Sequence, residues 1–174
     1  MAVFNKSDYL LTLERENKDI AMRYKDKIRV IQCMDPFTFT SEEMNSSIEC
    51  FPPVTAFDMS SYLVLTYRFY TNQQMKAYKS LTGYKYFEAG FVHDCEAKSI
   101  GEHIVVIVKV NHSQRMNNPP LQVWIIFEKD GAIISAHYTC MAGHSEVCSH
   151  VAAVLYGLEY INQFNISSNS RVQA

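Results

Sequence analysis

The spacing of apolar residues changes near residue 84. Before that point four aromatic or aliphatic residues recur at helical spacing: Tyr9, Leu13, Ile20 and Tyr24. With charged residues at the positions between them, they predict one amphipathic helix over residues 7–25, and Ser7 is a suitable N-cap. Residues 72–81 predict a second, short helix that ends near Gly83.

Beyond residue 84 the pattern is typical of β-strands. Three segments are rich in β-branched and aromatic residues: 86–95, 102–111 and 121–128. Residues 104–108 are apolar on both faces, which indicates a central strand that is covered on each side. Asp130 and Gly131 predict a hairpin turn into a return strand over 132–139. Trp124 has apolar neighbours, so we expect it in the core with its indole N–H hydrogen-bonded.

The chain ends with the pattern of a helix over residues 151–161, after which a polar segment rich in Ser and Asn is expected to fray. We therefore expect an α+β fold with a helical N-terminal part, an antiparallel sheet, and a C-terminal strand, Cys/His loop and helix. The predicted parts are a helical and irregular region (1–83), a sheet with a Cys/His module (84–162) and a flexible tail (163–174).

Composition narrows the class of protein. The 174 residues are 48% hydrophobic, which suits a globular fold, and the net charge of −2 excludes a broad cationic surface. The odd number of cysteines, five, and the absence of a hydrophobic N-terminal segment predict an intracellular protein, nuclear or cytoplasmic, without a disulfide framework. No apolar run is long enough for a membrane span.

Residue types that bind metals concentrate between positions 137 and 150. Cys140 is followed by seven residues and then by Cys148 and His150, where the C-terminal helix begins. Thiolate and imidazole groups are the usual ligands of tetrahedral Zn²⁺, and ligands on both sides of a short loop let one ion hold a strand end against a helix start. The spacing therefore predicts a zinc site.

This run resembles the SWIM-type zinc finger, whose pattern is Cys-x-Cys, seven or more residues, then Cys-x-His. Cys140, Cys148 and His150 match the last three positions, and Tyr138 stands at the first. Over residues 28–161 the chain is similar to animal proteins in which a SWIM-type domain precedes a phage-type exonuclease or recombinase domain. Four stretches carry that similarity: 35–36, 51–54, 70–81 and 112–124. The resemblance implies zinc binding and an association with mobile-element or DNA-processing proteins, but no nuclease activity, because this chain does not contain the nuclease domain.

Two histidines are candidates for the fourth ligand. His144 lies in the loop, where its side chain can turn toward the ion. His137 precedes Tyr138 in a predicted strand, so it would need a bulge or local twist to reach the same side as Cys140. The alternative is that Tyr138 marks a degenerate site whose cysteines are packing residues.

Two basic segments are candidates for contact with nucleic acid. Arg23, Lys25, Lys27 and Arg29 would lie along one side of an extended chain but would scatter around a helix. Arg115 lies in a polar loop between two predicted strands, where it could bind phosphate.

The sequence favours a binding role over a catalytic one. The spacing of Cys148 and His150 does not by itself produce an activated nucleophile, and no carboxylate pair has catalytic spacing. We expect a zinc-binding module that binds nucleic acid or targets a DNA-processing protein, or alternatively a protein-interaction adaptor with a structural or degenerate zinc site. Neither a membrane partner nor a small-molecule substrate is expected, and the oligomeric state is not predicted.

Overall fold

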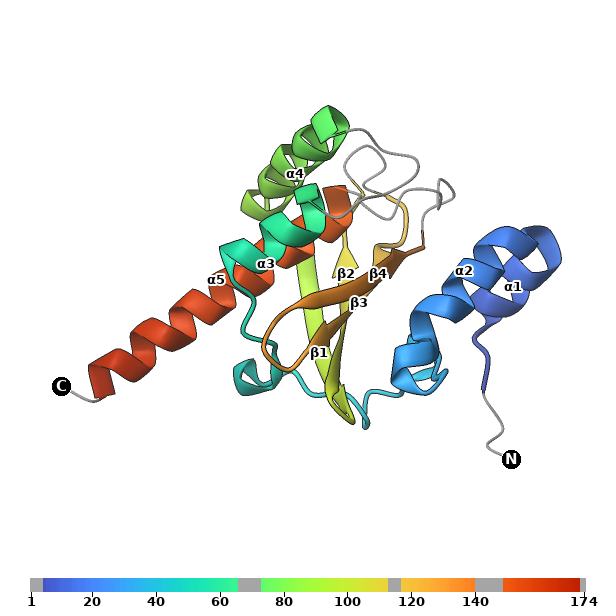
Figure 1. Cartoon of the computed structure of the whole chain (residues 1–174), viewed down its shortest axis with the longest axis horizontal. Coiled ribbons are helices and arrows are strands. Elements are labelled where there is room, and N and C mark those ends of the chain that lie inside the picture. The colour runs from blue at the N-terminus through green and yellow to red at the C-terminus, as the bar shows by residue number, and fades with distance from the viewer. Residues whose placement is uncertain (1–4, 66–72, 113–116, 140–148, 173–174) are drawn as a thin grey trace.

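The computed structural model describes residues 5–65, 73–112, 117–139 and 149–172, and Figure 1 shows how its elements are arranged. The α-helices are α1 (Asp8–Glu16), α2 (Lys18–Ile28), α3 (Ala56–Ser60), α4 (Gln73–Glu88) and α5 (Ser149–Val172). The strands are β1 (Val92–Ile100), β2 (His103–Val110), β3 (Leu121–Glu128) and β4 (Ile133–Tyr138). Short helical turns are Arg29–Ile31, Pro36–Thr38, Ile48–Cys50 and Ser61–Leu65. The strands form one antiparallel sheet in the order β1-β2-β3-β4, so the fold is α+β as predicted.

The sheet lies between two helical layers, with α1 and α2 on one face and α3, α4 and α5 on the other (Figure 1). Successive side chains of β2 point to opposite faces of the sheet, because side chains alternate along a strand. Val106 and Val108 pack in the core with α3 and α5, whereas Val105 packs in the core with α1 and α2. The predicted central strand is therefore confirmed.

The turn between β3 and β4 occurs at the predicted pair. Asp130 accepts a hydrogen bond from the backbone N–H of Ala132 at 3.0 Å, and Gly131 has a φ of 100°. A Cβ atom at Gly131 would lie 2.4 Å from the carbonyl oxygen of Pro53. Both the backbone conformation and the close contact therefore require glycine here.

Residues 7–25 form two helices, so the prediction of one continuous helix is wrong. Ser7 caps α1 as expected, accepting a hydrogen bond from the backbone N–H of Leu10. Asn17 leaves the helical conformation, with a φ of −149°, and its side chain accepts a hydrogen bond from the backbone N–H of Ile20 at 3.1 Å. An asparagine that caps the following helix ends the preceding one, which apolar spacing alone does not reveal.

The predicted end of α4 near Gly83 is also wrong, because the helix continues to Glu88. A Cβ atom at Gly83 would lie 2.5 Å from the Cβ of Ala152 and 2.8 Å from the carbonyl oxygen of Ser149. Glycine at this position therefore allows α4 to approach α5 rather than ending the helix. As a result, the boundary that was expected between the N-terminal region (1–83) and the sheet region (84–162) falls inside α4.

Helix α5 extends to Val172, well past the predicted end at residue 161. Within the segment expected to fray, the hydroxyl groups of Ser167, Ser168 and Ser170 each donate to the carbonyl oxygen four residues earlier at 2.9 Å. In the part of the chain that the structure describes, no helix combines the length and hydrophobicity that a bilayer span requires.

A chain of buried hydrogen bonds attaches the α1–α2 layer to the sheet. The indole N–H of Trp124 donates to the hydroxyl of Tyr24 at 3.2 Å, and this hydroxyl donates to Asp35 Oδ1 at 2.6 Å. The backbone N–H groups of Ser7 and Phe37 also donate to the Asp35 carboxylate, at 2.8 and 3.1 Å. Trp124 is therefore in the core with its N–H hydrogen-bonded, as predicted.

We expect a Tyr24→Phe variant to be less stable by about 1–3 kcal/mol, because Asp35 loses a buried donor and Trp124 loses its acceptor. Urea unfolding followed by tryptophan fluorescence measures the change. Tyr160→Phe is the matched control, since Tyr160 is 60% exposed, and it should alter stability by less than about 0.5 kcal/mol. Equal effects of the two substitutions would contradict the role given to the Tyr24 hydroxyl.

Candidate metal centre at the end of the sheet

The last residue of β4 meets the first turn of α5. The rings of Tyr138 and His150 are 6.3 Å apart between centroids, and the ring of Tyr86 from α4 is 5.4 Å from that of His150. Tyr138 is buried. The strand end and the helix start that flank the predicted zinc loop therefore lie side by side. Cys140, His144 and Cys148 lie outside the described residues.

The surroundings of His150 favour its neutral form. Burial lowers its pKa to about 4, and the charge of His112 adds to this effect. At neutral pH the imidazole is therefore uncharged, which is the form of histidine that binds metal ions. Its side chain has the chemical state of a zinc ligand.

His112 lies near this end of the sheet and is not among the ligands predicted from the sequence. It follows β2, and β2 and β4 run in the same direction because each pairs antiparallel with β3. The ends of both strands therefore reach the same edge of the sheet, where the charge of His112 acts on His150. A prediction that consecutive strands pair antiparallel would have placed the end of β2 near the end of β4, and so His112 near His150.

His137 points to the opposite face of the sheet from Tyr138. Its pairing with Trp124 continues regularly into that of Tyr138 with Val123, so the bulge that metal coordination would require is absent there. Its Nε2 shares a hydrogen bond of 2.7 Å with the Tyr9 hydroxyl, and its ring stacks on that of Trp124. His137 is thus held in the core below α1 and α2, away from His150.

The environment of His137 also opposes protonation. Burial lowers its pKa to about 3, and the charges of Lys27 and Arg23 act in the same direction. Lys27 in addition donates to the carbonyl oxygen of Ala136 at 2.9 Å. Lys27 and Arg23 therefore lie close to the end of β4, after which the segment of the predicted zinc ligands follows in the sequence.

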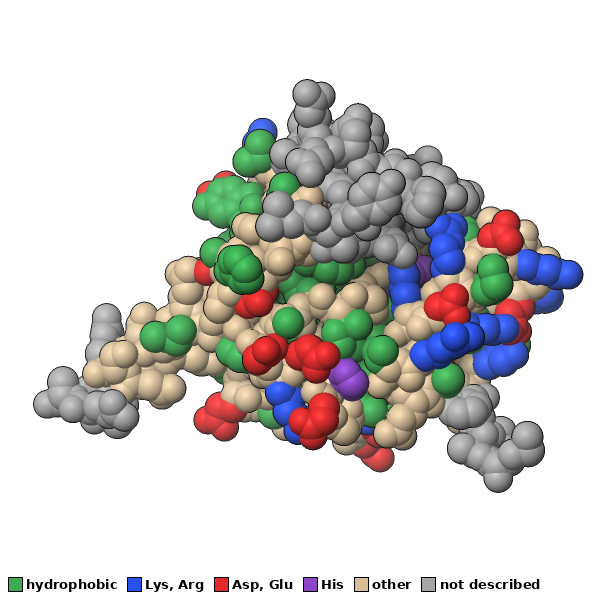
Figure 2. Space-filling view, viewed as in Figure 1, with side chains coloured by type: hydrophobic (Ala, Val, Ile, Leu, Met, Phe, Trp, Pro, Cys, Tyr) green, Lys and Arg blue, Asp and Glu red, His purple; other side chains and the backbone are tan. Residues whose placement is uncertain are grey.

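The other two cations in this segment pair with carboxylates. Lys25 forms an ion pair with Glu14, and Arg29 lies 3.2 Å from Asp26. Figure 2 shows Lys and Arg side chains gathered over α1 and α2 with acidic side chains among them. Since α2 is a helix, the four cations do not form the row that an extended chain would present. Arg115 lies outside the described residues.

No protein family, curated protein or solved structure matches this chain. Within residues 5–65, 73–112, 117–139 and 149–172, no group of three or more His, Cys, Asp or Glu side chains is placed to hold a metal ion. Cys33, Cys50 and Cys95 are free thiols in the same part of the chain.

We expect the metal-free protein to lose stability as the pH falls from about 6.5 toward 3. The unfolded chain binds the His137 proton near pH 6.5 and the folded chain only near pH 3, so the unfolded state holds more protons between these values. Each tenfold difference in proton affinity between the unfolded and folded states changes the free energy of unfolding by about 1.4 kcal/mol. His150 contributes in the same direction.

Replacing Tyr9 and His137 together by Phe should flatten this pH dependence, since it removes the titrating ring without leaving the tyrosine hydroxyl unpaired. Urea unfolding at several pH values measures it. The single Tyr9→Phe variant retains His137 and should keep the wild-type slope. An unchanged slope in the double variant would assign the acid sensitivity to other groups.

Proposed function

We propose that this protein is a zinc-binding module that resembles the SWIM type, in which Cys140, Cys148 and His150 hold one Zn²⁺. The observation that supports it is the contact between the end of β4 and the start of α5, with the rings of Tyr138 and His150 6.3 Å apart. A tetrahedral ion with ligands on both sides of the intervening loop would cross-link the strand to the helix. The role is structural and non-catalytic.

The fourth ligand in this proposal is His144 or His112. His144 belongs to the loop itself, and His112 lies close enough to His150 to affect its pKa. His137 is less suitable, because coordination would break its hydrogen bond with Tyr9 and expose a ring that is 5% exposed. The phenol of Tyr138 is not among the usual zinc ligands.

Purified, reduced protein should contain one zinc ion per chain, as measured by elemental analysis. Cys148→Ala should abolish stoichiometric binding, because a thiolate supplies both charge and a short bond to the ion. Cys50→Ala is the matched control, since Cys50 is a free thiol in a 3₁₀ turn, and it should retain the metal. Wild-type protein that is folded and metal-free would contradict the proposal.

The same measurement on histidine variants identifies the fourth ligand. Either His144→Ala or His112→Ala should weaken zinc binding, whereas His137→Ala should lower stability without changing the metal content.

The module's partner in this proposal is nucleic acid, bound through phosphate contacts beside the metal loop. Arg23 and Lys27 lie near the end of β4, where Lys27 donates to the carbonyl oxygen of Ala136 and the charges of both residues act on His137. The slightly acidic chain limits such contacts to a local patch. Arg115, which follows β2 in the sequence, would add a further cation.

Affinity for double-stranded DNA should fall with salt, because each phosphate contact releases counterions. Replacing Arg23 and Lys27 by Gln should flatten the slope of log affinity against log salt by about 1.8, or roughly 0.9 for each contact. Fluorescence anisotropy of zinc-loaded protein at several salt concentrations measures both. Replacing Lys25 and Arg29 by Gln is the matched control and should leave the slope unchanged, since these cations have carboxylate partners. Absence of binding at low salt would exclude DNA as the partner.

A protein-interaction adaptor is the second candidate. Its supporting observation is that Glu14 and Asp26 form ion pairs with Lys25 and Arg29, cations that a nucleic-acid-binding surface would use. An adaptor that binds through apolar surface should show little salt dependence.

A further inference from the structure

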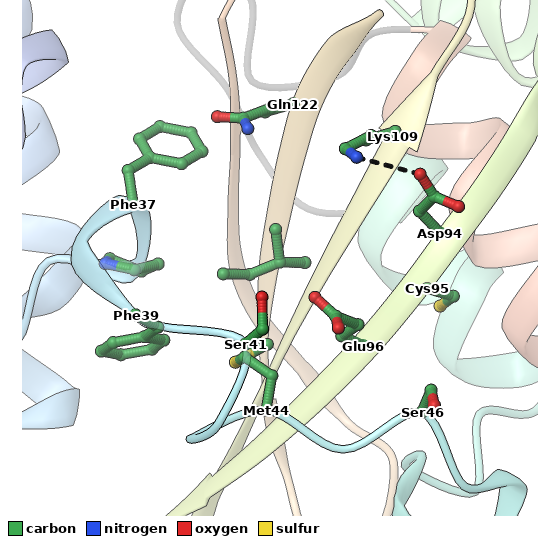
Figure 3. Close-up of a pocket in the computed structure, with 12 residues that line it drawn as sticks. Phe37, Phe39, Ser41, Met44, Ser46, Asp94, Cys95, Glu96, Lys109 and Gln122 are labelled. Atoms are coloured by element: carbon green, nitrogen blue, oxygen red, sulfur yellow. Dashed lines mark hydrogen bonds and ion pairs between the residues drawn. The ribbon is translucent and has the colours of Figure 1, made fainter.

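α1 and α2 leave part of their face of the sheet uncovered. Between this part and the segment of residues 36–46 lies a groove of about 480 Å³ (Figure 3). Its volume falls within the range of about 300–1,000 Å³ that is usual for ligand sites. His150 belongs to the other side of the sheet, so the groove is separate from the candidate metal centre.

An irregularity in β1 shapes one wall of this groove. His93 pairs with Lys109 and Glu96 with Ile107, so two residues of β1 stand opposite one residue of β2. The first of these two, Asp94, has a φ of 50°. Asp94, Cys95 and Glu96 all line the groove, and Cys95 also packs against the core on the opposite side of the sheet, with α3 and α5.

The charges in the groove do not balance. Lys109 lies 2.9 Å from Asp94 and lowers the pKa of that carboxyl group. Glu96 is half-buried, and its carboxylate forms no hydrogen bond or ion pair with any residue that the structure describes. In Figure 3 its carboxylate points into the groove. The groove therefore holds one carboxylate without a cationic partner.

Apolar side chains line the same groove. Phe37 and Met44 come from the segment that crosses the sheet, and Ile107 is the cross-strand neighbour of Glu96. A carboxylate beside an apolar wall is complementary to a long cationic side chain, whose alkyl part is apolar and whose end is charged. A simple metal ion would not use the apolar wall.

The chain already holds a cation in this way at the same wall. The ammonium group of Lys98 lies 4.2 Å from the ring centroid of Phe39, which also lines the groove, and 2.6 Å from Glu43 Oε1. The pair lowers the pKa of Glu43 to about 2, chiefly through the hydrogen bond from Lys98. A carboxylate and an aromatic ring therefore hold an ammonium group next to the groove.

We propose that the groove binds an arginine or lysine side chain of a partner polypeptide. Glu96 pairs with its charged end, while Phe37, Met44 and Ile107 contact its alkyl part and an adjoining apolar residue. The groove is a protein-docking site that does not depend on zinc or on nucleic acid.

The test uses an acetylated, amidated pentapeptide with a central arginine flanked by leucines, together with matched peptides that carry norleucine or glutamate at the centre. Binding to the full chain is followed by ¹H–¹⁵N NMR titration. The arginine peptide should shift the resonances of Glu96 and Ile107 and bind at least about tenfold more tightly than either matched peptide, as expected for a buried charge pair.

Two variants locate the contact. Glu96→Gln should weaken binding of the arginine peptide about tenfold, whereas the control Glu102→Gln should not, because Glu102 is exposed in the β1–β2 turn. Ile107→Lys places a cation opposite Glu96 and should block the groove. Thermal unfolding checks that each variant is folded.

Several results would overturn the proposal. These are an absence of shifts at millimolar arginine peptide, equal binding of the glutamate peptide, or full affinity in the Glu96→Gln variant. If butylguanidinium binds as tightly as the peptide, the occupant is a small organic cation and not a polypeptide. Self-association that Glu96→Gln abolishes would assign the groove to a second copy of this chain.

Discussion

The arrangement of the N-terminal half depends on the hydrogen bonds that the buried carboxylate of Asp35 accepts. Asp35 is 2% exposed and accepts hydrogen bonds from the cap of α1, from Tyr24 in α2 and from the turn that begins at Pro36. Through Tyr24 it is linked to Trp124 in β3. A buried carboxylate without such donors would cost several kcal/mol, so these segments stabilise one another only when they are assembled together.

This assembly decides which parts of the sheet remain accessible. α1 and α2 cover His137 and hold it against Tyr9 and Trp124, which removes it from the strand end where a metal ion is proposed. The same layer stops short of Glu96 and leaves the groove beside it open. The packing of α1 and α2 therefore keeps His137 away from the candidate metal centre and leaves the candidate docking site open. It also separates that docking site from the candidate metal centre.

The candidate metal centre depends on how the strands are paired. Antiparallel pairing of β2 and β4 with β3 makes their ends meet at one edge of the sheet, and α5 begins at that edge. At that edge the charge of His112 lowers the pKa of His150, although the two residues are far apart in the sequence. Proximity of this kind follows from topology, so no local pattern contains it.

The sequence by itself determined the features that depend on local chemistry. Alternating and continuous apolar runs predicted the strands, Asp130 and Gly131 the hairpin, and Ser7 the helix cap, because each rests on residues a few positions apart. The spacing of Cys140, Cys148 and His150 predicted a metal site, which stays a prediction. Only the tertiary structure decided the rest. Gly83 fits its helix because Ala152 lies 2.5 Å from where its Cβ would be, and His137 is buried because Tyr9 and Trp124 surround it. These outcomes depend on contacts between residues far apart in the chain, which periodicity and turn chemistry do not encode.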